Sequence, residues 1–161
     1  MKKHRKKYEK PKKPYDKIRI ERERELLSRY GLRRKREIWR AEAILRNLRR
    51  RARDILARKD PEKEKELLNK VVKMGLLEDN PTLEDVLGLT VENILERRLQ
   101  TLVYRLGLAR TPKQARQFIV HGHVELDGRR VVWPGMLVPA GAESKLRLRL
   151  DREKVFGGEA K

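Results

Sequence analysis

The hydrophobic residues between positions 35 and 58 recur at alternating spacings of three and four. This spacing places them on one face of an α-helix, which is the pattern of a helix packed against a core. A shorter helical pattern precedes it from Ile18 to Gly31, and Pro61 ends the long helix because proline cannot continue one. The apolar stripe of the long helix consists of Ile38, Ala41, Leu45, Leu48, Ala52 and Ile55.

Further helical segments lead into the C-terminal half of the chain. One ends at Gly75, and another begins at Thr82, a suitable N-cap residue. Apolar positions at helical spacing then continue from Thr90 to Gly107, so we expect one helix over residues 90–107. On such a helix Arg98 and Arg105 would share one shoulder of the apolar stripe and form a cationic ridge.

The pattern changes after residue 110. Thr111 and Pro112 are an N-cap and first-turn pair, and the helix they begin ends at His121 before Gly122. Two strand-like segments follow, joined by the dipeptide Asp-Gly, which predicts a type I′ hairpin; alternating leucines over 145–150 predict a third, half-buried strand. The sequence therefore predicts an α+β fold, with a helical N-terminal lobe and two short helices packed on a small antiparallel sheet.

The net charge of the chain indicates that this small protein binds a polyanionic partner. The 161 residues include 43 Lys and Arg against 24 Asp and Glu, a formal net charge of +19. Such a charge repels itself and favours a partner that neutralises it, as nucleic acid does. Residues 1–17 are basic with almost no apolar side chains, so we expect a flexible tail there. We expect a helical lobe over 18–90 that binds the polyanionic partner, the second domain over 91–155 and a C-terminal tail over 156–161.

Other classes of protein fit poorly. Cysteine is absent, so the chain can form neither a disulfide nor a thiolate zinc site, and we expect no metal site and no cofactor. No apolar run is long enough to span a bilayer, and the first residues lack the apolar stretch of a signal peptide, so we expect a soluble intracellular protein without a membrane partner.

We expect Trp39 and Trp133 to be half-buried packing residues and not base-stacking platforms.

The polar faces of the long helix are covered by arginines, and only Glu37, Glu42 and Asp54 oppose them locally. A solvated helix face usually mixes charges at i,i+4 spacing, whereas like charges at that spacing repel each other. We interpret this cluster as a phosphate-facing surface, with a merely solvated face as the alternative. The candidate RNA contacts on this helix are Arg46, Arg49, Arg50 and Arg53.

The residues after position 94 resemble a known RNA-binding domain. The stretch TPKQARQFI fits the pattern T-P-x-x-A-R-x-x-I, and GHVELDG fits G-H-V-x-x-D-G. This succession of helix, helix and hairpin is similar to the S4 RNA-binding domain, which also occurs in pseudouridine synthases, some tyrosyl-tRNA synthetases and a heat-shock protein. Upstream, YGLRRKREIWRAEAILRNLRRRAR and LERRLQTLVYRLGLA resemble the archaeal and eukaryotic branch of the small-subunit ribosomal protein S4 family.

This resemblance implies a structural protein of the cytoplasmic ribosome. Members of the family bind small-subunit rRNA early in assembly, hold a multi-helix junction between the helical lobe and the S4 domain, and line the region where mRNA enters; neighbouring small-subunit proteins would be its other partners. Some bacterial members bind metal through cysteines that this chain lacks, and Val120 stands where many members have a polar residue. The family's RNA-contacting positions correspond to Arg98, Arg105, Arg110, Thr111, Lys113, Gln114, Arg116, Gln117, His121 and His123.

Two other functions share these features. One is a pre-ribosomal assembly factor that processes rRNA, which would have the same fold. The other is an RNA-modifying enzyme that docks through an S4 domain. An enzyme needs an acid, base or nucleophile placed in a pocket, and the basic helices outside the domain offer no obvious one. We therefore expect a protein that is not an enzyme and not a homo-oligomer.

Overall fold

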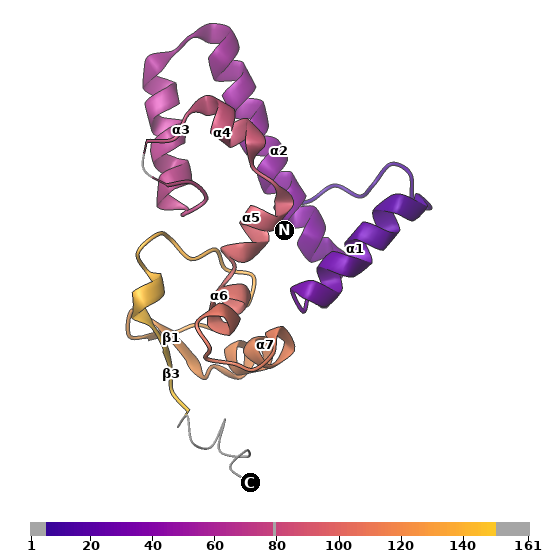
Figure 1. The fold of residues 1–161 in the computed structure, drawn as a ribbon, viewed down its shortest axis with the longest axis vertical. Coiled ribbons are helices and arrows are strands. Elements are labelled where there is room, and N and C mark those ends of the chain that lie inside the picture. Colours follow the sequence, from indigo (N-terminus) through magenta and orange to yellow (C-terminus); the bar gives the residue numbers. More distant parts are fainter. Residues whose placement is uncertain (1–5, 79, 151–161) are drawn as a thin grey trace, which may run out of the picture.

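The computed structural model describes residues 6–78 and 80–150. In Figure 1 a helical lobe and a smaller mixed domain follow one another along the long axis, and α1 projects to one side. The helical lobe contains α1 (Lys17–Arg29), α2 (Lys35–Arg58), α3 (Pro61–Lys73), α4 (Leu83–Gly88) and α5 (Val91–Glu96). The second domain contains α6 (Leu99–Arg105), α7 (Pro112–His121), β1 (Val124–Leu126), β2 (Arg129–Arg130), the 3-10 helix η1 (Glu143–Lys145) and β3 (Leu146–Leu148). The predicted α+β class is confirmed.

Helix α2 organises the helical lobe, and its apolar stripe is buried as predicted. All six stripe residues are buried and pack with residues from α3, α4 and α5 in one core. The helix ends at Arg58, and the next residue, Lys59, adopts the left-handed conformation with φ 52°. Asp60 then begins α3 by accepting a hydrogen bond from the backbone N–H of Lys63. Local capping chemistry therefore turns the chain back against α2.

Helix α1 is held against the start of α2 by a buried carboxylate. Glu23 is only 2% exposed and accepts hydrogen bonds from the Arg19 guanidinium at 2.7 Å and the Trp39 indole N–H at 2.9 Å. Its other oxygen lies 2.9 Å from the ammonium group of Lys35. Trp39 is half-buried, as predicted, and its ring lies 5.8 Å from that of Tyr8.

The single helix expected over residues 90–107 is wrong, because the chain forms two helices separated at Arg97 and Arg98. Arg98 is extended, with φ −73° and ψ 142°, and forms a bridge with Leu137. The amide of Leu99 donates to the Met136 carbonyl at 2.8 Å, and the amide of Val138 donates to the Arg97 carbonyl at 3.0 Å. The segment around residues 136–138 thus supplies the hydrogen bonds that a continuous helix would have made within itself.

The break also separates two cores. Val91, Ile94 and Leu95 pack into the core of the helical lobe, whereas the apolar residues from Leu99 onward pack into a second core. The second core therefore starts at Leu99. Apolar spacing continues across the break because each half still needs one buried face.

The second domain packs α6 and α7 against a three-stranded antiparallel sheet of order β2-β1-β3. Asp127 and Gly128 have φ values of 53° and 74°, so the predicted type I′ hairpin is confirmed. Helix α7 has the predicted bounds, with Thr111 as its cap and Gly122 in the left-handed conformation at its end. In β3, Leu146 is buried and Arg147 is exposed, as the alternating pattern predicted.

The described N-terminal segment contains little regular structure. Residues 6–16 contain no helix or strand, and Asp16 caps α1 by accepting from the amide of Arg19. Residues 1–5 and the predicted C-terminal tail over 156–161 lie outside the described residues, so the expected flexibility of the tails stays a prediction. Within the described part of the chain, no helix is long and apolar enough to cross a membrane.

Candidate nucleic-acid interface

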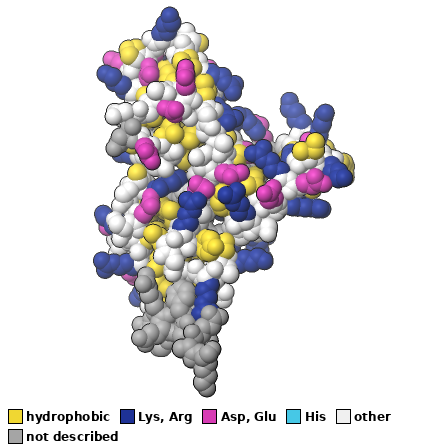
Figure 2. Space-filling model, in the orientation of Figure 1, with side chains coloured by type: hydrophobic (Ala, Val, Ile, Leu, Met, Phe, Trp, Pro, Cys, Tyr) yellow, Lys and Arg dark blue, Asp and Glu magenta, His cyan; other side chains and the backbone are white. Residues whose placement is uncertain are grey.

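Basic side chains are spread over both parts of the molecule. Figure 2 shows Lys and Arg side chains around the projecting α1 and along the face that joins the helical lobe to the second domain. Acidic side chains lie between them, so a basic side chain is available to a ligand only where no acidic group already pairs with it. The candidate residues therefore have to be sorted by what each guanidinium or amide already contacts.

The four candidate arginines of α2 differ from one another. Arg50 and Arg53 are exposed and form no ion pair within the described residues. Arg46 is also exposed but pairs with Glu9. Arg49 is half-buried, and its guanidinium donates to the Leu89 carbonyl at 2.6 Å, which joins α2 to the end of α4. The available part of this predicted surface is thus centred on Arg50 and Arg53.

Helix α7 presents a second set of polar side chains. Arg110, Thr111, Lys113, Gln117 and His121 are exposed, and so is the apolar Val120, as its outward position predicted. Thr111 accepts from the Gln114 amide at 3.1 Å, and the Gln114 side chain accepts from the Arg110 amide at 2.7 Å. The side chains of Thr111 and Gln114 therefore both stabilise the N-terminus of α7.

The end of α7 brings two histidines together. The rings of His121 and His123 are stacked with centroids 6.2 Å apart, and Phe118 meets the His123 ring edge-on. The Arg130 guanidinium donates to the His121 carbonyl at 3.2 Å, which ties the hairpin to the end of the helix. No group of three or more His, Cys, Asp or Glu side chains within the described residues is arranged to hold a metal ion.

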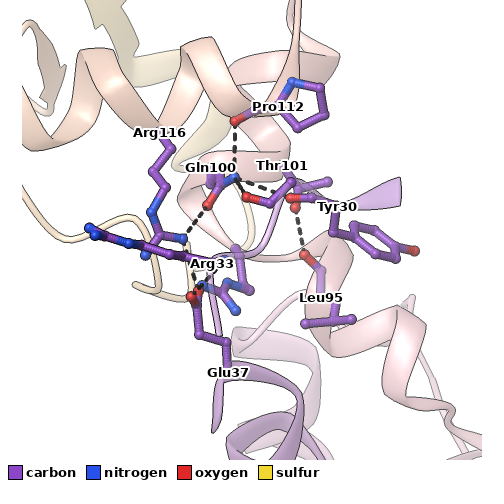
Figure 3. Close-up of polar contacts among 10 residues, drawn as sticks. Tyr30, Arg33, Glu37, Leu95, Gln100, Thr101, Pro112 and Arg116 are labelled. Atoms are coloured by element: carbon purple, nitrogen blue, oxygen red, sulfur yellow. Dashed lines mark hydrogen bonds and ion pairs between the residues drawn. The ribbon is translucent and has the colours of Figure 1, made fainter. Parts of the chain in front are cut away.

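Arg98 and Arg116 both contact Glu37 of the helical lobe and so lie between the two parts of the molecule. Figure 3 shows Arg116 and Glu37 in this contact. Arg98 forms an ion pair with Glu37 from the first turn of α2, and Arg116 from α7 lies 3.1 Å from the same carboxylate oxygen. The Arg98 side chain is 7% exposed and that of Glu37 is 15% exposed. Burial alone would raise the pKa of Glu37, but hydrogen bonds from Arg116 and Arg98 hold it below its ordinary value.

Gln100 completes this contact and is itself fully buried. Its side-chain NH2 group lies within hydrogen-bonding distance of the carbonyls of Tyr30, Gly31 and Pro112, at 3.1, 2.9 and 2.9 Å. Its amide oxygen lies 3.3 Å from the Arg116 guanidinium. We call Glu37, Arg98, Gln100 and Arg116 the inter-lobe latch, because they join α2 and the preceding turn to α6 and α7.

The predicted ridge of Arg98 and Arg105 is therefore wrong. The helix break sends Arg98 inward to Glu37, while Arg105 stays exposed and pairs with Glu96 at 2.7 Å. Local sequence patterns do not indicate this contact, because the partner of Arg98 lies 61 residues away along the chain. A signal for the latch did exist in Gln100, one of two consecutive polar residues, with Thr101, between the apolar positions Leu99 and Leu102.

Beside the latch lies a groove of about 600 Å3 between the helical lobe and the second domain. Arg33, Arg34, Arg36 and Arg40 line one side, and residues 133–137 line the other. Arg34, Arg36 and Arg40 are exposed and form no ion pair within the described part of the chain. Trp133 is 67% exposed, so the prediction that it packs half-buried is wrong. We call this feature the inter-lobe groove.

Comparison with known proteins gives consistent matches along the chain. The family model described as "Ribosomal protein S4/S9 N-terminal domain" matches residues 2–96, and the model described as "S4 domain" matches residues 97–144. The two matches meet at the helix break between α5 and α6.

Individual relatives extend this similarity over most of the chain. A protein of Sulfurisphaera tokodaii named "Small ribosomal subunit protein uS4" is 53% identical over 146 residues, which are 88% of this chain and 82% of that protein. A protein of the same name from Methanothermobacter thermautotrophicus is 50% identical over 145 residues, covering 88% of this chain and 85% of that one.

Proposed function

This chain belongs to the family of small-subunit ribosomal protein uS4, and from that premise we propose that it is a structural, non-enzymatic component of the small ribosomal subunit in the cytoplasm. Its partners are rRNA and neighbouring ribosomal proteins. The observation that carries the proposal is the inter-lobe groove, where arginines without ion-pair partners in the described chain line a concave surface.

The groove suits the backbone of structured RNA. Phosphates supply most of the attraction between nucleic acids and basic proteins, and the planar guanidinium group bonds phosphate oxygens in pairs. Folded RNA is recognised largely by shape, so a rigid concave cationic surface matches it better than a flexible one does. The inter-lobe latch supplies that rigidity by joining the helical lobe to the S4 domain through buried groups.

The finer part of the proposal is that the groove holds a multi-helix junction of small-subunit rRNA during assembly. The direct contacts would come from exposed cations and polar groups on two surfaces that meet at the groove. Arg98 would act indirectly, by fixing the two lobes. The proposed direct contacts are Arg34, Arg36, Arg40, Arg50, Arg53, Arg105, Arg110, Lys113, Gln117 and His121.

A further part of the proposal follows from the family resemblance alone: the protein lines the region where mRNA enters the small subunit.

The rival function, a pre-ribosomal factor that processes rRNA, uses the same fold. The two functions differ in whether the protein stays in the mature small subunit, because an assembly factor leaves before the subunit matures. Cofractionation of the protein with mature small subunits supports the ribosomal role, and its confinement to precursor particles contradicts that role.

The RNA-binding proposal is tested by filter binding of the full chain. One probe is a small-subunit rRNA fragment that contains a multi-helix junction, and the control is an unbranched duplex of equal length. We expect tighter binding to the junction at every salt concentration and a steep loss of affinity with salt for both probes. Equal affinity for the two probes would contradict recognition of a junction, and undetectable binding to both would contradict the RNA-binding function.

A further inference from the structure

Trp133 occupies an unusual position for the largest apolar side chain of a small protein. It is 67% exposed and lies on the wall of the inter-lobe groove, at the start of the turn Trp133-Pro134-Gly135-Met136. The other tryptophan, Trp39, is half-buried, and its indole N–H is bonded to Glu23. Packing therefore accounts for Trp39 but leaves most of the Trp133 ring facing solvent.

The backbone beneath Trp133 is fixed. The Met136 amide donates to the Trp133 carbonyl at 3.1 Å, closing the turn. The amides at the start of α6 donate outward to the same turn: Gln100 to the Pro134 carbonyl at 3.3 Å and Leu99 to the Met136 carbonyl at 2.8 Å. Since Gln100 also belongs to the inter-lobe latch, the turn is joined to the contact that sets the lobe arrangement.

The surroundings of the ring are cationic. The opposite wall of the groove carries Arg34, Arg36 and Arg40, which are exposed and form no ion pair within the described residues. The one carboxylate of the groove, Glu37, is already neutralised by two arginines. An exposed aromatic ring among free cations suits an anionic ligand with flat apolar faces. The groove also carries apolar side chains, among them Ile44, Met136 and Leu137, so it is the exposed arginines without ion-pair partners among the described residues that favour an anionic ligand over a protein segment.

We propose that Trp133 is a stacking platform for one unpaired base of RNA, whose neighbouring phosphates are bound by Arg34, Arg36 and Arg40. The inference rests on the proposed RNA-binding function. Bases stack on aromatic side chains regardless of sequence, because every base has a π face. Unpaired bases of loops, bulges and junctions are the ones available for such stacking. The ligand class is therefore a single-stranded nucleotide at a junction, and not a regular duplex.

The test uses the full chain with Trp39→Phe, so that Trp133 is the only tryptophan and its fluorescence reports on the groove. Two probes of equal length are titrated at low salt: an oligoadenylate, and an oligomer with the same ribose-phosphate backbone but without bases. Stacking predicts that the oligoadenylate binds more tightly and quenches Trp133. The baseless oligomer should bind through the arginines with little quenching.

The variant Trp133→Ala removes the platform, and Trp133→Tyr keeps an aromatic face in its place. From the usual strength of base stacking, we expect Trp133→Ala to bind oligoadenylate about 5- to 150-fold more weakly, with Trp133→Tyr recovering most of the affinity and the baseless probe little affected. Thermal melts of each variant should match the parent protein, because Trp133 contributes little to either core.

The outcomes separate this inference from the proposed function. If the Trp133→Ala protein binds oligoadenylate and a junction-containing rRNA fragment as the parent does, the stacking role is refuted while RNA binding stands. Equal quenching by the two probes also refutes stacking. If neither the parent nor the variant binds any of the RNA probes, the proposed function itself fails. Loss of binding to a small-subunit protein, with RNA affinity unchanged, would assign Trp133 to a protein interface and overturn the proposal.

Discussion

Replacing Glu37 with Gln should destabilise the junction between the two lobes more than any change of an exposed charge. The substitution keeps the size of the side chain but removes the carboxylate that pairs with both Arg98 and Arg116, and the described residues supply no second one there. Arg98 then remains buried with a charge and no counter-ion, since its side chain is 7% exposed. The single amide oxygen of Gln can accept either from the Arg33 backbone N–H, which lies 3.2 Å from Glu37, or from the guanidinium groups, but not from both sides as the carboxylate does.

The loss of folding free energy caused by Glu37→Gln can be estimated from the burial of the ion pair. Removing one partner of a buried ion pair costs about 3–5 kcal/mol, and the 15% exposure of the Glu37 side chain places this case near the lower end, at about 3 kcal/mol. The double variant Glu37→Gln/Arg98→Met removes the stranded charge and fills its volume with an apolar chain. We expect it to recover at least about half of the loss, because replacing a buried pair by neutral groups is often close to neutral.

The assay is urea unfolding of the full chain, followed by circular dichroism and by tryptophan fluorescence. The matched control is Glu92→Gln, which removes the partner of Arg29 from an ion pair whose side chains are 56% and 41% exposed, and should cost less than about 1 kcal/mol. The reasoning is refuted if Glu37→Gln and Glu92→Gln have similar small effects, or if adding Arg98→Met increases the loss. Folded Glu37→Gln protein should also bind junction RNA more weakly, since its lobes are no longer held in one arrangement.

Three further predictions concern neighbouring features. Gln100→Leu should cost about 1–3 kcal/mol, measured by the same urea unfolding, because it leaves buried carbonyls without their donor; the cost would be negligible if those carbonyls were solvated. The pKa of Glu37 is lowered by folding, so its stabilising effect is present above about pH 4.5 and is lost as the pH falls; the deficit of Glu37→Gln should therefore shrink in acid, and a constant deficit would contradict this. The double variant of Arg50→Gln and Arg53→Gln should keep its thermal stability but reduce the slope of log affinity against log salt by roughly one to two units in filter binding, whereas an unchanged slope would mean that these arginines touch no phosphate.

Features set by neighbouring residues could be predicted from the sequence. The buried stripe of α2 follows from helical spacing, and the bounds of α7 follow from the cap Thr111 and the stop Gly122. The type I′ turn follows from Asp127-Gly128, since both positions need positive φ values.

Features set by distant residues could not be predicted in this way. The break at Arg97 and Arg98 depends on hydrogen bonds from residues 136–138, and apolar spacing alone runs straight across it. The role of Arg98 depends on Glu37, which only the tertiary fold brings near. The exposure of Trp133 depends on how its turn docks on α6. Sequence therefore predicted a basic RNA-binding surface, while the structure distinguishes arginines that hold the lobes together from arginines that face solvent.

The central claim is that small-subunit rRNA lies in the inter-lobe groove, and photo-crosslinking tests it most directly. The full chain is bound to a junction-containing small-subunit rRNA fragment and irradiated, and the crosslinked peptides are identified by mass spectrometry. We predict crosslinks in peptides that cover residues 33–40 and 133–137, from the two sides of the groove, with Trp133 among the crosslinked residues. We also predict crosslinks in the peptide that covers residues 110–123, whose exposed polar side chains are among the proposed contacts. Crosslinks confined to α3 and α4, with the groove peptides unmodified, would contradict the claim.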